Sequence, residues 1–203
     1  NYKDYKNQLG GFYPPNKIFI NINFLDSLSD KELKSGLGEM SHYFVISGKK
    51  DFKQYLEHYR SINSNKIILQ KMISNSLKIK KKYIEIDEFD QKERQIFNYG
   101  HSFGHAIESL TNYNVPHGIA VSFGMDIANY VSVRKGFLEE SVRNDIRKFL
   151  EEIWLGFDIS NLNINKFTNA LSKDKKNVGN ELRLILCKGY GRVLKVAQEL
   201  NPE

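Results

Sequence analysis

Three of the chain's five histidines fall within a single short stretch, at positions 101, 105 and 117. His101 and His105 are four residues apart, so on a helix their imidazoles lie on one face and can reach a common point. His117 follows a short loop that ends in Pro116, and it can fold back toward the other two. Because a catalytic zinc site needs three protein ligands and an open position, spacing alone nominates His101, His105 and His117.

Two glycines, Gly100 and Gly104, accompany these histidines inside a segment that is otherwise typical of a helix. Each costs a helix about 1 kcal/mol relative to alanine. That cost indicates a close backbone approach or a ligand rather than simple packing. The alternative interpretation is that the three histidines are polar residues whose hydrogen bonds are satisfied within a pair of helices.

The elements that would position these residues are mostly helical. Ser29, with Glu32 three residues later, is typical of a helix N-terminus, and apolar residues recur at helical spacing from there to about Ile46. Further helices are expected near residues 51–60, 62–80, 93–111, 117–135, 139–153 and 164–173. The run Lys17–Ile22 predicts a short strand, and alternation over 182–196 predicts a hairpin turned at Gly189–Tyr190–Gly191. The sequence therefore predicts a mainly α domain with a short strand and a late β-hairpin.

The composition is ordinary for a globular protein, with 40% hydrophobic and 27% charged residues among 203. No stretch approaches the roughly 20 apolar residues that span a bilayer, and the first residues do not form a signal peptide. A single cysteine, Cys187, is expected in the core, and it fits a reducing, cytoplasmic compartment.

The net charge of +6 suggests an anionic partner. The lysines are scattered and lack a stacking-aromatic motif, which argues against nucleic acid. A phosphorylated small molecule would be served by a few convergent lysines and an arginine. No glycine-rich turn between a strand and a helix is visible, so the chain shows no dinucleotide-binding fingerprint.

Several motifs resemble those of the 3-dehydroquinate synthase family. NYGHSFGHAIES (98–109), followed by HGIAVSFGM (117–125), is similar to the family signature. Three further segments match it in the correct order: KNQLGGFYPP (6–15), LKSGLGEMSHYFVI (33–46) and LSKDKKNVGNELRLIL (171–186). The resemblance spans nearly the whole chain. It implies that residues 1–203 form the C-terminal metal- and substrate-binding domain of such an enzyme, and that the N-terminal dinucleotide-binding domain is absent from this chain.

The resemblance changes the ligand assignment that spacing suggested. It implies that Glu39, His101 and His117 bind Zn²⁺ or Co²⁺, and that His105 transfers a proton or orients the substrate. It also implies substrate contacts from Asn7, Lys80, Arg94, Asn98 and one of Lys175 and Lys176. Arg94 precedes His101 by two turns of the expected helix, which would turn both toward one cleft.

The family reaction implied by the resemblance is a lyase reaction of the shikimate pathway, in aromatic amino acid biosynthesis. Bound NAD oxidises a phosphorylated sugar acid, phosphate is eliminated, and re-reduction, ring opening and aldol closure follow. The implied NAD contacts are Lys6 and the turn formed by Phe24, Leu25, Asp26 and Ser27. The isolated chain is expected to be inactive without the missing dinucleotide-binding domain, and a homodimer is possible.

Two positions depart from the family pattern. His42 stands where the family has a lysine, and Ile119 stands where it has a glutamate. A different sugar-phosphate cyclase is therefore an alternative to dehydroquinate formation. A second alternative is a metal-dependent polyol dehydrogenase, which the set of lysines and the arginine disfavours. A third is a non-catalytic zinc-binding module derived from the enzyme.

Overall fold

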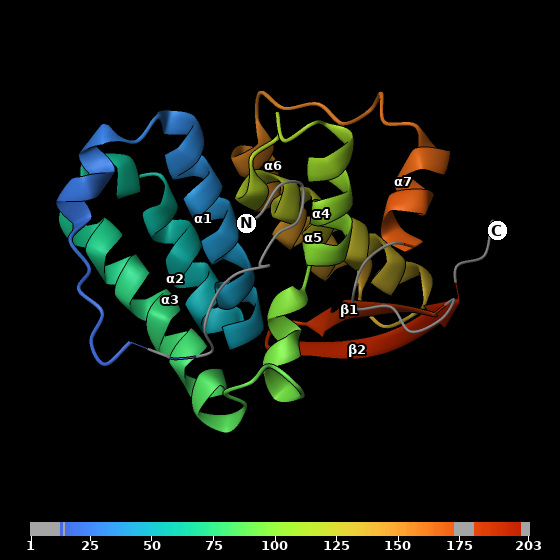
Figure 1. The fold of residues 1–203 in the computed structure, drawn as a ribbon, viewed down its shortest axis with the longest axis horizontal. Coiled ribbons are helices and arrows are strands. Elements are labelled where there is room, and N and C mark those ends of the chain that lie inside the picture. Colours follow the sequence, from blue (N-terminus) through green and yellow to red (C-terminus); the bar gives the residue numbers. More distant parts are fainter. Residues whose placement is uncertain (1–12, 14, 173–180, 200–203) are drawn as a thin grey trace.

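A computed structural model describes residues 13, 15–172 and 181–199 of the chain. Short 3-10 helices cover η1 (Ile22–Ser27), η2 (Ile62–Ser64) and η3 (Glu93–Asn98). The α-helices are α1 (Asp30–Ser47), α2 (Lys49–Tyr59), α3 (Lys66–Ile86), α4 (His101–Leu110), α5 (His117–Arg134), α6 (Glu140–Trp154) and α7 (Ile164–Ser172). Strands β1 (Glu181–Gly189) and β2 (Arg192–Glu199) pair as one antiparallel hairpin (Figure 1). The predicted mainly helical fold with a late hairpin is confirmed.

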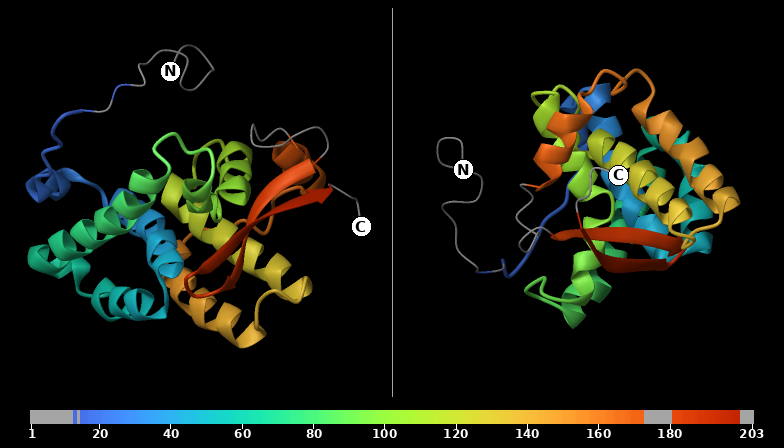
Figure 2. Two further views of the ribbon diagram at one scale, coloured as in Figure 1. Left: turned by 90° about the horizontal axis from the view of Figure 1, so that it is seen from below. Right: turned by 90° about the vertical axis from the view of Figure 1, so that its right-hand side faces the viewer.

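Helix α5 is the centre of this arrangement. Every residue from Gly118 to Asp126 is buried, so this part of the helix is covered on all sides. It packs against α1, α4, α6 and β1, while α2 and α3 pack against α1 on the far side (Figures 1 and 2). Since α1, α4 and α5 carry the candidate metal ligands, the core of the domain also sets the geometry of the site.

Gly118 lets α1 and α5 come into backbone contact. A Cβ atom at this position would lie 1.8 Å from the carbonyl oxygen of Ser35. The Gly118 N–H instead donates a hydrogen bond of 2.9 Å to the Ser35 hydroxyl. Glu39 lies one turn after Ser35, and His117 precedes Gly118, so this close approach brings the two side chains together.

The helix predicted over residues 93–111 is wrong in one respect, because it is interrupted. The 3-10 helix η3 ends at Asn98, and α4 begins only at His101. Between them Gly100 adopts a left-handed conformation with φ of 79°. A Cβ there would lie 2.7 Å from the Val121 carbonyl oxygen, so this glycine caps α4 where it meets α5. The spacing of apolar residues in the sequence does not reveal such a change of direction.

The strand predicted over Lys17–Ile22 is also wrong. Residues 17–21 are not part of a strand, and Ile22 already begins η1. The Asn21 side chain caps that 3-10 helix by accepting a 3.0 Å hydrogen bond from the Asn23 N–H. The run has strand propensity, but no strand of the part of the chain described here pairs with it.

Other local predictions hold. Ser29 caps α1, and its hydroxyl accepts from the Glu32 N–H at 3.3 Å. Cys187 is fully buried in β1, as expected of a core residue. None of the helices within the described ranges is long and apolar enough to cross a membrane.

Candidate metal centre

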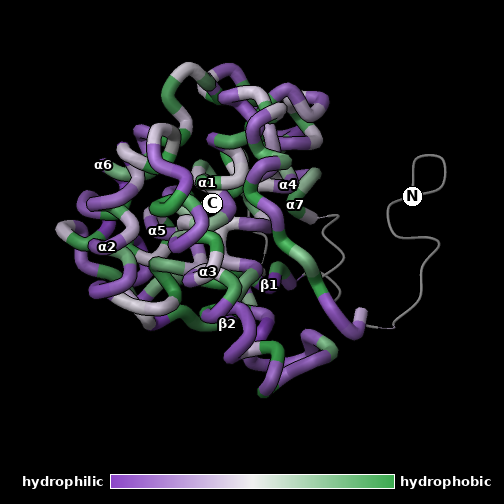
Figure 3. Tube along the Cα trace, turned by 90° about the vertical axis from the view of Figure 1, so that its left-hand side faces the viewer, coloured by the Kyte–Doolittle hydropathy of each residue, from purple (hydrophilic) through white to green (hydrophobic). Residues whose placement is uncertain are grey.

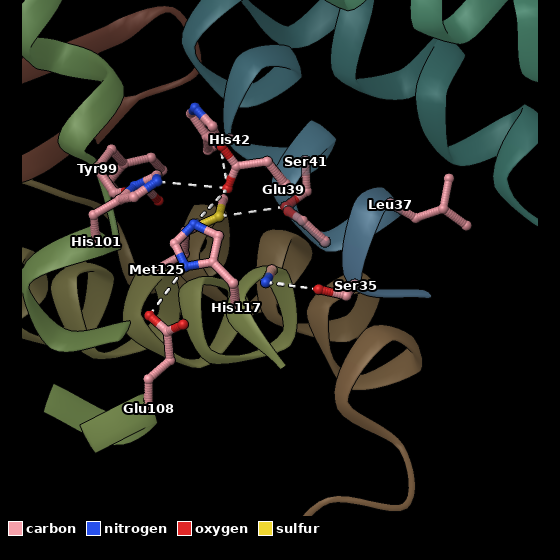
Figure 4. Close-up of polar contacts among 12 residues, drawn as sticks. Ser35, Leu37, Glu39, Ser41, His42, Tyr99, His101, Glu108, His117 and Met125 are labelled. Atoms are coloured by element: carbon pink, nitrogen blue, oxygen red, sulfur yellow. Dashed lines mark hydrogen bonds and ion pairs between the residues drawn. The ribbon is translucent and has the colours of Figure 1, made fainter. Parts of the chain in front are cut away.

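Three side chains from three helices meet around one point in Figure 4. Glu39 comes from α1, and His101 and His117 are the first residues of α4 and α5. The Glu39 Oε2 atom lies 3.5 Å from Nε2 of His101 and 3.4 Å from Nε2 of His117. One ligand atom from each of the three residues lies within 4.8 Å of the other two.

The spacing and chemistry of this cluster fit a zinc ion. Two atoms bound at about 2.0–2.2 Å to one tetrahedral zinc lie about 3.3–3.6 Å apart, close to the two separations found here. The Glu39 Oε2 atom is buried and has no hydrogen-bond partner among the described residues. Because a buried carboxylate oxygen without a partner is costly, a cation between these atoms would satisfy it.

Both histidines are oriented by hydrogen bonds on the opposite side of their rings. The Nδ1 atom of His117 lies 3.0 Å from Oε2 of Glu108, and Nδ1 of His101 lies 3.2 Å from the carbonyl oxygen of Tyr99. These contacts turn each Nε2 toward Glu39, as is usual for metal-binding imidazoles. Sequence reasoning did not assign Glu108 a role. The signal available was a carboxylate three residues after His105 and seven after His101, which places it on the same face of α4.

The charges of the cluster shift its pKa values. Burial opposes ionisation of Glu39, but the imidazoles of His101 and His117 outweigh it and hold the pKa of this carboxyl well below its usual range. The hydrogen bond to Glu108, followed by the contact with the Glu39 carboxylate, raises the pKa of His117 from 6.5 to about 9. Without a cation, the pair is therefore an ionised carboxylate beside a protonated imidazole.

His105 lies beside the cluster and not between its ligand atoms. Its ring centroid lies 5.6 Å from those of both His101 and His117, and its side chain is exposed. A second set of possible ligands, His105, Glu108 and His117, shares one histidine with the first. In that set Glu108 already binds the Nδ1 side of the shared ring, so the arrangement around Glu39 is the better cation site.

The two departures from the family pattern occupy different surroundings. His42 is fully buried one turn after Glu39, with Nδ1 3.9 Å from Oε2 of that carboxylate. Neither ring nitrogen has a hydrogen-bond partner among the residues that the structure describes. Burial lowers the pKa of His42 to about 3, so the ring is neutral. Ile119 is fully buried in the hydrophobic core. His42 thus changes the surroundings of the Glu39 carboxylate, whereas Ile119 contributes to the hydrophobic core.

A pocket of about 190 Å³ opens beside the cluster. Its lining residues are Glu39, Tyr43, Lys80, Asp90, Arg94, Phe97, Asn98 and His101. Lys80 is half-buried, unlike Lys78, Lys81 and Lys82 of the same run, and its ammonium lies 5.9 Å from the centre of the Tyr43 ring. The pocket is thus lined by two candidate metal ligands, by the cationic side chains of Lys80 and Arg94, and by the amide of Asn98.

A loop held by Asp87 places Arg94 in this pocket. The Asp87 carboxylate accepts hydrogen bonds from the N–H groups of Gln91, Lys92 and Arg94, at 2.9, 2.7 and 3.1 Å. The Arg94 guanidinium donates to the Glu88 carbonyl, and its Nε lies 3.8 Å from Asp90. Arg94 therefore reaches the cleft from η3 and not, as expected, from the same helix as His101.

A larger pocket of about 510 Å³ lies between α2 and α6 and shares no lining residue with the first. Its charged residues include the ion pair of Arg60 with Glu152, whose atoms are 2.8 Å apart. No group of potential metal ligands found in the described residues lies there. The smaller pocket is therefore the candidate site.

The remaining nominated residues fall into two groups. Lys6, Asn7, Lys175 and Lys176 lie outside the described residues. Phe24, Leu25, Asp26 and Ser27 belong to η1 and do not line the pocket. Asp26 instead forms an ion pair of 2.5 Å with Lys66 at the start of α3.

Known proteins are similar to this chain in both sequence and fold. The profile described as 3-dehydroquinate synthase C-terminal matches residues 36–177. A 3-dehydroquinate synthase of Dictyoglomus thermophilum is 37% identical over 95% of this chain and 55% of its own length. One of Alkaliphilus metalliredigens is 34% identical over 98% of this chain and 56% of its own length. The chain thus spans about half the length of these relatives.

Solved structures share the fold. One is 2-deoxy-scyllo-inosose synthase complexed with carbaglucose-6-phosphate, NAD⁺ and Co²⁺, with a TM-score of 0.80 at 20% identity over 98% of this chain and 57% of that one. Another is 2-epi-5-epi-valiolone synthase from Streptomyces hygroscopicus with NAD⁺ and Zn²⁺ bound, with the same TM-score and identity over 98% and 56%. The match over residues 36–177 establishes that the chain belongs to the 3-dehydroquinate synthase family, in the region of its C-terminal domain.

Proposed function

We propose that this chain is the metal- and substrate-binding half of an NAD-dependent cyclase that eliminates phosphate from a phosphorylated sugar acid, as a 3-dehydroquinate synthase does. The observation that carries the proposal is that a three-ligand cluster and a cationic pocket share Glu39 and His101. The single cysteine and the family together support a cytoplasmic location.

Glu39, His101 and His117 would hold the cation, and Glu108 and Tyr99 would keep the two imidazoles facing it. A bound zinc or cobalt ion polarises an oxygen on the ring carbon that is oxidised. The cluster fits this task because it offers three ligands from one side and leaves the pocket side open for substrate.

The pocket residues suit an anionic, hydroxylated substrate. The forked guanidinium of Arg94 and the ammonium of Lys80 can pair with phosphate or carboxylate oxygens, and Asn98 can bind a hydroxyl. We propose that His105 orients a substrate hydroxyl or transfers its proton, and that Asn7 and one of Lys175 and Lys176 complete the contacts.

The redox step requires NAD, which we propose is held mainly by a separate dinucleotide-binding domain. Lys6 and residues 24–27 would lie at its boundary with this chain. Alone, the chain is proposed to bind zinc without appreciable NAD affinity and without turnover. A different sugar phosphate is the second candidate substrate, because His42 replaces a family lysine beside the cluster.

The test joins this chain to the part of the Dictyoglomus thermophilum relative that precedes the matched region. With zinc and NAD, the chimera is expected to release phosphate from a heptulosonate phosphate. Glucose 6-phosphate tests the alternative substrate class. A chimera that binds both zinc and NAD yet releases phosphate from neither compound would refute the cyclase assignment.

The role of Arg94 in binding the anionic substrate is tested separately. Arg94→Ala is expected to weaken binding of the heptulosonate phosphate about 10- to 100-fold, since charge-assisted hydrogen bonds are lost, while zinc content stays the same. Lys82→Ala, at an exposed lysine near the same end of α3, is expected to change neither quantity. Equal effects of the two substitutions would exclude a specific role for Arg94.

A further inference from the structure

Tyr43 lies on α1, one turn after Glu39, and lines the small pocket beside the metal cluster. The residue is only 9% exposed. Its hydroxyl oxygen forms no hydrogen bond with the residues that the structure describes, yet this atom is not shut off from solvent. The hydroxyl group therefore opens onto the pocket, where a ligand can reach it.

The two fully buried tyrosines of the described chain use their hydroxyls within the fold. The Tyr55 hydroxyl donates to the Leu37 carbonyl at 2.6 Å, and the Tyr99 hydroxyl donates to the Asn129 side chain at 2.6 Å. The Tyr43 hydroxyl has no such task, so a phenylalanine would pack equally well in its place. Its position in the pocket wall therefore points to a ligand as its partner.

Neighbouring aromatic rings hold Tyr43 in place. Its ring centroid lies 3.9 Å from that of His42 and 4.9 Å from that of Phe97. Phe97 in turn packs edge-on against Tyr83 of α3, also at 4.9 Å. The side chain is thus fixed between α1, η3 and α3 before a ligand arrives, so little conformational entropy is lost when one binds.

The Tyr43 ring also contacts one of the two cations of the pocket. Helix α3, which carries Lys80, packs against α1, and hydrophilic and hydrophobic residues are interspersed along it (Figure 3). Lys80 is half-buried, whereas Lys81 and Lys82 are exposed. Its ammonium lies 5.9 Å from the centre of the Tyr43 ring, within the range of a cation–π contact. This contact keeps the ammonium at the pocket that Lys80 lines.

The Tyr43 hydroxyl is a hydrogen-bond donor at neutral pH. Burial, together with the nearby Glu39 carboxylate, raises the pKa of Tyr43 well above its usual range, although the Arg94 charge opposes this shift. The hydroxyl therefore keeps its proton, and it binds most strongly to an ionised acceptor oxygen. Lys80 and Arg94 add two positive charges to the same pocket, so an oxyanion is the ligand that fits all three groups.

We propose that Tyr43 is a further substrate-binding residue, whose hydroxyl donates a hydrogen bond to the oxyanion held by Lys80 and Arg94 and whose ring positions the Lys80 ammonium. The inference rests on the proposed function in taking this pocket as the substrate site. A phosphate and a carboxylate offer the same kind of acceptor oxygen, and a phosphorylated sugar acid carries both.

The hydroxyl is tested by calorimetry of the zinc-loaded chain with heptulosonate phosphate and with glucose 6-phosphate. Tyr43→Phe keeps the ring and is expected to weaken binding of at least one compound about 10-fold or more, since a hydrogen bond to a charged group is lost. Zinc content should stay the same. The control Tyr130→Phe, at a tyrosine of α5 that is 51% exposed, should bind as the wild type does.

The ring is tested by a double-mutant cycle. Lys80→Ala should weaken binding less in Tyr43→Leu than in the wild type, because without the ring the ammonium is already misplaced. In Tyr43→Phe the full effect of Lys80→Ala should remain. Should Tyr43→Leu not fold, Tyr43→Met, with its longer apolar side chain, takes its place. Equal effects of Lys80→Ala in every background would overturn the positioning role.

The two compounds distinguish the two oxyanions. Weaker binding of both in Tyr43→Phe identifies the phosphate as the group at Tyr43, whereas weaker binding of heptulosonate phosphate alone identifies the carboxylate. Unchanged binding in Tyr43→Phe, or a wild-type chain that binds neither compound, overturns the role of the hydroxyl. Binding that depends on Tyr43, together with a chimera that releases no phosphate, would refute the proposed function and leave this inference standing.

Discussion

The carboxylate of Glu108 lies 3.0 Å from Nδ1 of His117, on the side of the imidazole opposite to the atom that faces Glu39. Glu108 sits near the end of α4, and His117 begins α5 after a short loop. The contact therefore fixes the ring at the point where the chain reverses direction. A ligand held in this way has its orientation set before any cation arrives.

Glu108→Ala is expected to lower zinc affinity about 10- to 100-fold, the usual effect of removing a carboxylate that orients a metal-binding histidine. Glu108→Gln keeps an acceptor for the Nδ1–H group and should lose less. Affinity is measured by competition with a chromophoric chelator. Glu85→Gln, on the exposed surface of α3, serves as the control. Unchanged affinity in Glu108→Ala would show that the contact does not support the cation site.

Zinc binding should be accompanied by proton release. The pKa of His117 is raised to about 9 in the metal-free chain, and zinc binds only the neutral imidazole, so a proton must leave below that pH. Because this proton competes with zinc for His117, the apparent zinc affinity should rise about tenfold for each pH unit up to about pH 9. Calorimetry in buffers of different ionisation enthalpy counts the released protons. Release that is the same in Glu108→Ala, which lacks the main cause of the shift, would contradict this account.

His42 should make the metal-free chain sensitive to acid. Its pKa is lowered from 6.5 to about 3, so between these values the unfolded chain binds a proton that the folded chain does not. This contribution is absent above pH 6.5 and destabilises the fold by roughly 1.4 kcal/mol for each unit below it. The free energy of unfolding, measured by urea denaturation at a series of pH values, should fall less steeply below pH 6.5 in His42→Leu than in the wild type. His58→Leu should keep the steep fall. The same pH dependence below pH 6.5 in the wild type and His42→Leu would assign the acid sensitivity to other groups.

Gly118→Ala should destabilise the domain by about 1–3 kcal/mol or more, because the added methyl group meets the Ser35 carbonyl of α1. Gly36→Ala adds the same methyl group one residue after Ser35, where nothing lies within 4 Å. That variant should be neutral or up to about 1 kcal/mol more stable, since alanine favours a helix. Urea denaturation compares the two. Similar stabilities would mean that α1 and α5 separate readily.

Much of the fold could be predicted because the helices carry local signals. Ser29 and Glu32 mark the start of α1, and the apolar spacing of α6 and α7 follows the helical repeat. The break at Gly100 was missed because a left-handed glycine and a mid-helix glycine look alike in sequence. The segment 17–22 was misassigned because strand propensity says nothing about whether a partner is present.

The site was harder to predict than the fold. Histidine spacing alone selected His105, which lies on the same helix as His101, and not Glu39, which lies 62 residues before it. That choice depends on the packing of α1 against α5 through Gly118, a tertiary contact with no local sequence signal. Only the family resemblance nominated Glu39. Glu108 and Asp87 act through other residues, so neither histidine spacing nor the family resemblance singled them out.

The origin of the three ligands in α1, α4 and α5 has a consequence for how the domain folds. In the unfolded chain Glu39 is separated from His101 by a long loop, so a preformed cation site does not exist there. A cation bound by all three would act as a removable cross-link, binding the native state in preference to the unfolded one. At a free concentration 100 times its dissociation constant it would add about 2.7 kcal/mol to the free energy of unfolding. Metal supply would then determine how much of the chain escapes proteolysis, in addition to any part that the ion has in turnover.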